Sequence, residues 1–194
     1  MNPDKIILVT GGARGIGRGC VHACAARGWS VVAADLSHDG DLPDGVAFVE
    51  CDVTDASAIH DVVSQVVQRF GRLDGAVANA GVPDWEPFLE LSPETYQRVM
   101  KVNVEGVFRT AQEAGRQMAE QGHGSMVLMS SVRAVASNPL HAAYTASKGA
   151  VNGLVTALAT ELGPMGIRVN GVLPGACDTP MQDAAAAAFF AGDA

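Results

Sequence analysis

Short, continuously apolar runs alternate with longer amphipathic stretches along most of the chain. Six apolar runs predict strands: Ile6–Thr10, Ser30–Ala34, Val46–Cys51, Leu73–Ala78, Ser125–Ser130 and Ile167–Leu173. Four amphipathic stretches between them predict helices: Gly15–Arg27, Ala56–Phe70, Pro93–Gln121 and Ala142–Leu162. Strands without polar alternation are typical of a parallel sheet covered on both faces. We therefore expect an α/β fold, a doubly wound parallel sheet of the Rossmann type in three layers.

Composition and charge narrow the class of partner. The chain has 194 residues, of which 48% are hydrophobic and 18% charged. We expect a single globular domain over residues 1–194. A net charge of -8 repels a phosphate backbone, so neither nucleic acid nor a membrane is an expected partner. The four cysteines form no disulfide or zinc pattern, and the start of the chain has no signal-peptide pattern, so we expect no metal and a cytoplasmic location.

A glycine-rich turn joins the first predicted strand to the first predicted helix. It reads Thr10-Gly11-Gly12-Ala13-Arg14-Gly15-Ile16-Gly17. Glycines at this junction let a pyrophosphate approach the N–H groups at the helix start, where the helix dipole favours an anion. A plain structural turn is the alternative, but the strand before and the helix after favour a dinucleotide site.

An acidic residue, Asp35, follows the second apolar run. A carboxylate there can accept hydrogen bonds from the adenosine ribose hydroxyls and would repel a 2′-phosphate, which favours NAD over NADP. A solvated carboxylate at a strand end is the alternative. Arg14 argues the other way, because a basic side chain beside the loop could meet a 2′-phosphate; we give Asp35 more weight because its charge should lie closest to the discriminating hydroxyl.

Tyr144 and Lys148 lie four residues apart near the start of the last predicted helix. This spacing puts both side chains on one helix face. A free tyrosine has a pKa near ~10, and a neighbouring ammonium should lower that value toward the working pH range. Such pairs also arise by chance, so the spacing alone leaves a catalytic and an incidental interpretation open.

Taken together, these motifs make the chain similar to the compact type of short-chain dehydrogenase/reductase, from Lys5 to about Met181. The supporting motifs occur in the family's order: the loop Thr10–Gly17, Asp52-Val53, Asn79-Ala80-Gly81, Asn103, Ser131, Tyr144 with Lys148, and Asn170-x-x-x-Pro174-Gly175 with Thr179. Taken singly, some have plain alternatives. Ser131 could merely end a strand, with Ser130 as a rival, and Asn103 could be a helix residue bonded to backbone.

The resemblance implies a role for each of these residues. Tyr144 would exchange the proton with the substrate oxygen, Lys148 would hold the nicotinamide ribose, and Ser131 would hydrogen-bond the reacting oxygen. Asn103 would hold a water that links Lys148 to solvent. The implied cofactor contacts are Gly11, Arg14, Gly15, Ile16, Gly17, Asp35, Asp52, Val53, Asn79, Ala80, Gly81, Tyr144, Lys148, Pro174, Gly175 and Thr179.

The resemblance also sets an expected activity and an alternative. It implies hydride transfer between a nicotinamide cofactor and a secondary alcohol or ketone, in a homo-oligomer (dimer or tetramer), and Asp35 makes NAD rather than NADP the expected cofactor. Family members continue beyond the Pro-Gly segment with a lid, a helix and a last strand, whereas this sequence stops at Ala194. We therefore interpret residues 176–194 as a partial substrate lid and expect the last strand–helix portion to be missing. The alternative is a nucleotide-binding relative without turnover, acting as a sensor or scaffold.

Overall fold

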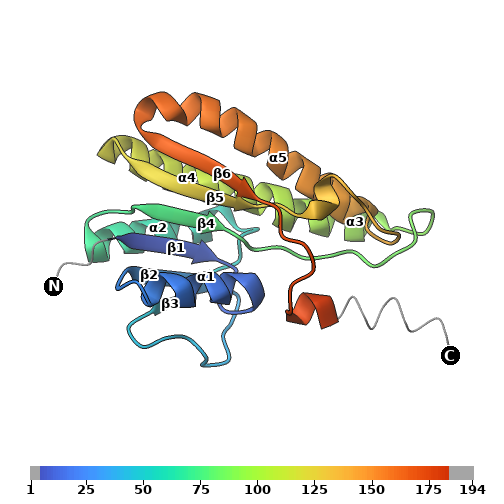
Figure 1. The fold of residues 1–194 in the computed structure, drawn as a ribbon, viewed down its shortest axis with the longest axis horizontal. Coiled ribbons are helices and arrows are strands. Elements are labelled where there is room, and N and C mark those ends of the chain that lie inside the picture. The colour runs from blue at the N-terminus through green and yellow to red at the C-terminus, as the bar shows by residue number, and fades with distance from the viewer. Residues whose placement is uncertain (1–4, 184–194) are drawn as a thin grey trace.

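A parallel sheet of six strands organises the protein, seen in a computed structural model that describes residues 5–183. The strands are β1 (Ile6–Thr10), β2 (Ser30–Asp35), β3 (Ala47–Glu50), β4 (Gly75–Ala78), β5 (Gly124–Met129) and β6 (Ile167–Val172). Their spatial order is β3-β2-β1-β4-β5-β6 (Figure 1), which is the Rossmann-type order. The expected doubly wound parallel sheet is confirmed.

Alternate residues of each central strand face two different helical layers. Ile7 and Val9 of β1 pack with Val21 of α1 (Gly15–Ala25). Ile6 and Leu8 belong to the larger core on the other face. That core is covered by α2 (Ala56–Phe70), α4 (Val107–Gln121) and α5 (Ala142–Leu162). Both faces of β1 and β2 are thus buried, which explains why their sequences are apolar without alternation.

The long helix expected over Pro93–Gln121 is interrupted in the structure. It consists of α3 (Pro93–Met100), a π-helical segment Lys101–Gly106, and α4. Asn103 lies inside the π-helical segment and is fully buried. Amphipathic periodicity does not distinguish the two helix types, and π-helical turns occur often at functional sites.

The carboxyl ends of the strands lie along one edge of the sheet. Thr10 of β1 pairs with Ala78 of β4, which pairs with Leu128 of β5. The chain beyond β6 then runs past the strand ends toward α1 (Figure 1). The part of the expected lid after residue 183 lies outside the described residues. Within residues 5–183 no helix is long and apolar enough to cross a membrane, and no group of acidic, histidine or cysteine side chains could hold a metal.

Candidate functional site

The glycine loop lies at the carboxyl end of β1 and leads into α1. Gly11 has φ +62°, and a Cβ on Gly17 would stand 2.0 Å from the carbonyl oxygen of Gly11. Both positions therefore require glycine. No side chain caps the N-terminus of α1, whose N-cap residue is Arg14. The N–H groups at the start of α1 are thus available to an anion, and the loop fits a pyrophosphate.

Asn79 joins the glycine loop to the end of β4. Its Nδ2 donates to the carbonyl oxygens of Thr10 (3.2 Å) and Gly11 (2.9 Å). A Cβ on Gly11 would stand 2.8 Å from Cα of Ala80, so the two turns touch at the backbone. The expected cofactor residues Asn79 and Ala80 thus lie directly beside the loop, and Gly81 follows them in the same turn.

Asp35 ends β2 and points at the same loop. Its Oδ2 accepts from the N–H of Ala13 at 3.0 Å, and its Oδ1 accepts from the N–H of Leu36 at 2.8 Å. The Nη2 of Arg14 lies 3.6 Å from Oδ1. The two residues with opposing implications for NAD and NADP therefore form an ion pair, in which Asp35 is buried and Arg14 is more than half exposed.

The remaining expected cofactor residues occupy both flanks of this edge. Ile16 lies half-buried in the first turn of α1, Val53 is buried beside the π-helical segment, and Asp52 is exposed. Beyond β6, the carbonyl oxygen of Pro174 accepts from the N–H of Val132 at 3.0 Å, and Gly175 is exposed. Thr179 lies against the loop, since a Cβ on Gly15 would be 3.4 Å from its Cγ2.

Tyr144, Ser131 and Lys148 come together where β5 ends and α5 begins. Ser131 lies close enough to the Tyr144 hydroxyl for its side chain to lower the pKa of that phenol. The Nζ of Lys148 lies 5.5 Å from the centre of the Tyr144 ring and donates to the carbonyl oxygen of Met129 at 2.8 Å. Ser130 is turned away, because its hydroxyl donates to the carbonyl oxygen of Lys148 at 3.0 Å. Of the two rival serines, the geometry places Ser131 at the tyrosine.

Burial is the largest influence on the pKa values of Tyr144 and Lys148. It raises the pKa of Tyr144, and the Ser131 hydrogen bond and the Arg133 charge offset only part of that effect. Burial also lowers the pKa of Lys148 to about 8. The sequence predicted a Tyr144 pKa lowered by Lys148. The structure has the opposite direction, because the phenolate loses its hydration when the ring is buried.

Asn103 reaches the site from the π-helical segment. Its Oδ1 accepts from the N–H of Val82 at 2.8 Å, and its Nδ2 donates to the carbonyl oxygen of Val82 at 2.9 Å and to Oγ of Ser147 at 3.0 Å. A Cβ on Gly81 would stand 3.4 Å from Oδ1 of Asn103 and 3.5 Å from Nζ of Lys148. Asn103 and Lys148 therefore meet at the turn that follows β4.

Sequence reasoning missed one residue of this cluster, Asp84. Its buried carboxylate accepts from the N–H of Ala143 at 3.1 Å and from the N–H of Tyr144 at 2.9 Å. Nothing near Asp84 in the sequence signals this contact, because its partners lie 59 and 60 residues away.

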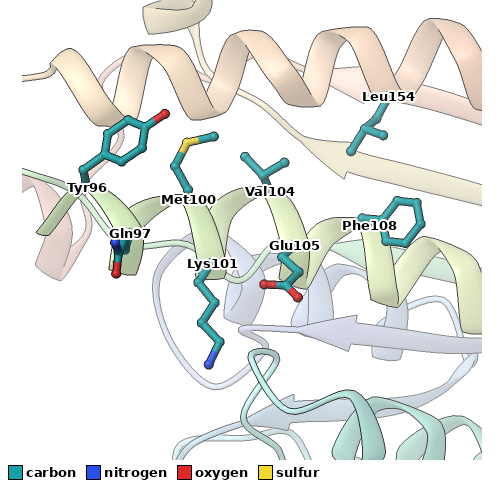
Figure 2. A pocket seen from close by; sticks show the side chains of 8 residues that line it. All are labelled: Tyr96, Gln97, Met100, Lys101, Val104, Glu105, Phe108 and Leu154. Carbon is teal, nitrogen blue, oxygen red and sulfur yellow. The ribbon is translucent and has the colours of Figure 1, made fainter. Parts of the chain in front are cut away.

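A separate hollow of about 570 Å³ lies on the outer surface of the helices, away from this edge. Met100 and Val104 point from the α3–α4 stretch toward α5, and Leu154 points back from α5 (Figure 2). None of the expected cofactor or catalytic residues lines it. Its lining marks an exposed apolar surface, distinct from the strand ends.

Comparisons with known proteins agree on one family. Residues 5–188 match the family model described as short chain dehydrogenase. A 3-alpha-(or 20-beta)-hydroxysteroid dehydrogenase of Mycobacterium bovis is 39% identical over 185 residues, covering 92% of this chain and 71% of the relative. The crystal structure of levodione reductase has a TM-score of 0.92 at 31% identity, covering 97% of this chain and 78% of that one. A 3-ketoacyl-(acyl-carrier-protein) reductase from Brucella melitensis, complexed with NADH, has a TM-score of 0.89 at 29% identity, covering 94% and 80%.

Proposed function

Because the chain belongs to the short-chain dehydrogenase family and is therefore an oxidoreductase with a nicotinamide cofactor, we propose that it transfers a hydride between NAD(H) and a secondary alcohol or its ketone. The observation that carries this proposal is the convergence of Tyr144, Ser131 and Lys148 next to the turn after β4, which in turn contacts the glycine loop. The nicotinamide supplies the hydride acceptor or donor, and the protein supplies orientation and the proton.

The cofactor would lie along the strand ends. The start of α1 and the glycine loop would bind the pyrophosphate, with Thr179 over the loop. Asp35 would accept from the adenosine ribose, Asp52 and Val53 would contact the adenine, and Asn79–Gly81 would line the nicotinamide side. We infer a preference for NAD, because the Asp35 carboxylate already neutralises Arg14, the nearest cation.

In the reducing direction, Tyr144 would donate its phenolic proton to the carbonyl oxygen, while Ser131 would hydrogen-bond that oxygen. Lys148 would hold the nicotinamide ribose and return a proton to Tyr144. We infer that Asn103 holds a water between its Oδ1 and Lys148, since both groups lie around Gly81. A raised pKa keeps Tyr144 protonated at neutral pH. Ketone reduction should therefore proceed near neutrality, and alcohol oxidation should require alkaline pH.

The test separates binding from turnover. NADH and NADPH binding would be followed by fluorescence, and reduced-nicotinamide absorbance would then be recorded with a panel of ketones and secondary alcohols. The names of the relatives suggest three members of that panel: a hydroxysteroid, levodione and a 3-ketoacyl thioester. We expect NADH to bind and at least one class to be turned over. Binding without turnover across the panel would favour the alternative, a nucleotide sensor or scaffold.

We also propose a homo-oligomer of one catalytic domain, in which residues 176–194 contribute to covering the substrate. The surface that would pair is the hollow of Figure 2, where Tyr96 and Phe108 expose 44% and 41% of their area. A molar mass by light scattering that matches a single chain would contradict this proposal. The free thiols of the described cysteines favour a reducing compartment, the cytoplasm.

A further inference from the structure

The helix that carries Tyr144 and Lys148 is capped from a distant part of the chain. Its N-cap residue, His141, makes no side-chain cap bond. The carboxylate of Asp84 takes that place instead, accepting from the N–H groups of Ala143 and Tyr144. By contrast, α2 and α3 are capped locally, by Asp55 and Ser92. A carboxylate suits a helix N-terminus.

Asp84 belongs to the loop that continues the turn after β4, which contains Asn79, Ala80 and Gly81. Gly81 lies three residues before it. Between them, the backbone N–H and carbonyl of Val82 are both bound by the side-chain amide of Asn103. Residues 82–84 are therefore fixed on one side to the π-helical segment and on the other to the first turn of α5. The loop cannot shift without breaking charge-assisted or buried hydrogen bonds.

The backbone of Tyr144 is linked to this loop directly through its N–H and indirectly through its carbonyl oxygen. Its N–H donates to Asp84 at 2.9 Å, and its carbonyl oxygen accepts from Oγ of Ser147 at 2.7 Å. Ser147 in turn accepts from Asn103, which binds the loop at Val82. The tyrosine backbone is thus tied to the turn after β4 by two independent routes, and only one of them, Asp84, carries a charge.

We propose that Asp84 is a positioning residue for the reaction. It fixes the first turn of α5 so that the phenol of Tyr144 reaches Ser131 and the substrate oxygen next to the turn after β4. Asp84 acts through the backbone, and no proton passes through it. This inference rests on the proposed role of Tyr144. It adds a residue that affects the reaction rate without itself touching the substrate.

The variants are Asp84→Ala, which removes both acceptors, and Asp84→Asn, which keeps one accepting oxygen at nearly the same volume. Asp55→Ala is the matched control, because it removes an aspartate cap from α2, a helix without an assigned catalytic residue. Three properties would be measured in each: NADH affinity, kcat with KM, and the pKa of Tyr144. The chain has two tyrosines, so the tyrosinate absorbance in a Tyr96→Phe background reports Tyr144 alone.

For Asp84→Ala we expect kcat to fall by up to about 10²-fold, the scale of a catalytic group misplaced by roughly 1 Å, with NADH affinity and KM nearly unchanged. Loss of the Ser131 hydrogen bond should move the Tyr144 pKa further upward. Asp84→Asn should show smaller changes in kcat and in the Tyr144 pKa than Asp84→Ala. Asp55→Ala should change neither kcat nor that pKa. If Asp84→Ala fails to fold, the asparagine variant carries the test.

Two outcomes would overturn the proposal: an Asp84→Ala enzyme (or an Asp84→Asn enzyme, if the alanine variant does not fold) with wild-type kcat and wild-type Tyr144 pKa, or a Tyr144 pKa that moves downward. The downward shift would mean that the carboxylate acts by its charge on the phenol. Amide exchange at Ala143 and Tyr144 should accelerate in both Asp84 variants even if the wild-type protein turns over no substrate. A failure of the proposed function is therefore distinguishable from a failure of this inference.

Discussion

The edge of the sheet at which the carboxyl ends of the strands lie has two halves that are built in different ways. The half that we propose to bind the cofactor consists mainly of backbone: the glycine loop, the start of α1 and the turn after β4, in contact at the main chain of Gly11 and Ala80. The half around Tyr144 consists of side chains that come from distant segments. Among its contacts, Asn103 and Ser147 are 44 positions apart in the sequence, and Asp84 and Tyr144 are 60 positions apart.

This difference predicts different sensitivities. A backbone site should fail when a side chain is added, because a Cβ fills the space that the ligand or a neighbouring turn requires. A side-chain site should fail when a group is removed, and its ionisation should follow burial more than any single neighbour. The variants below test that contrast, in order of decreasing expected effect.

Removing the amine of Lys148 should have the largest effect. We expect Lys148→Met to lower kcat by about 10³-fold, because the ribose contact and the proton supply are lost together. The same change should stabilise the fold. A lysine with a pKa near 8 is charged at neutral pH at a cost of about 3 kcal/mol. Loss of the bond to Met129 offsets roughly 1 kcal/mol of that gain.

The pH dependence of the free energy of unfolding tests whether burial of Lys148 destabilises the fold. The unfolded lysine keeps its proton to higher pH than the folded one, so wild-type stability rises as pH increases from about 8 toward the unfolded pKa. The gain in folding stability of Lys148→Met over the wild type should therefore be greatest below pH 8 and decrease above it. Chemical denaturation at several pH values measures this. A variant less stable than the wild type at pH 7 would refute the account of Lys148.

Adding a methyl group to the loop comes next. Gly17→Ala places a Cβ against the carbonyl oxygen of Gly11 and should weaken NADH binding about 10²-fold by displacing the loop. Gly19→Ala is the matched control in the same helix, since its added Cβ meets nothing within 4 Å beyond the neighbouring backbone of the helix itself. NADH titrations of both proteins make the measurement. Equal affinities for the two variants would show that the loop is not the pyrophosphate site.

The smallest effect concerns the choice of cofactor. Asp35→Ala removes the carboxylate that faces Arg14, so the preference for NADH over NADPH should narrow by at least roughly tenfold, or reverse. The double variant Asp35→Ala/Arg14→Ala should lose that gain in NADPH affinity. Parallel titrations with the two cofactors measure the ratio. Tighter binding of NADPH than NADH by the wild type would mean that Arg14 dominates.

The same contrast explains how far the sequence could be interpreted. The loop Thr10–Gly17 and the end of β2 at Asp35 were predictable because their geometry follows from local residue types. The π-helical segment at Asn103 was not, because its amphipathic pattern matches an ordinary helix and the partner of Asn103, Val82, lies 21 positions away in the sequence. Asp84 gave no signal, since its partners lie in another part of the chain. The pKa direction of Tyr144 depends on burial by the assembled fold.

The central claim is that Tyr144 moves the proton while the backbone half holds the dinucleotide. The most direct test is Tyr144→Phe, with NADH affinity and turnover measured on the same preparation. The account predicts that affinity changes little while kcat falls by about 10²–10⁴-fold, the usual contribution of a positioned acid or base. A loss of turnover below about tenfold, or a loss of NADH affinity that matches the loss of turnover, would contradict it.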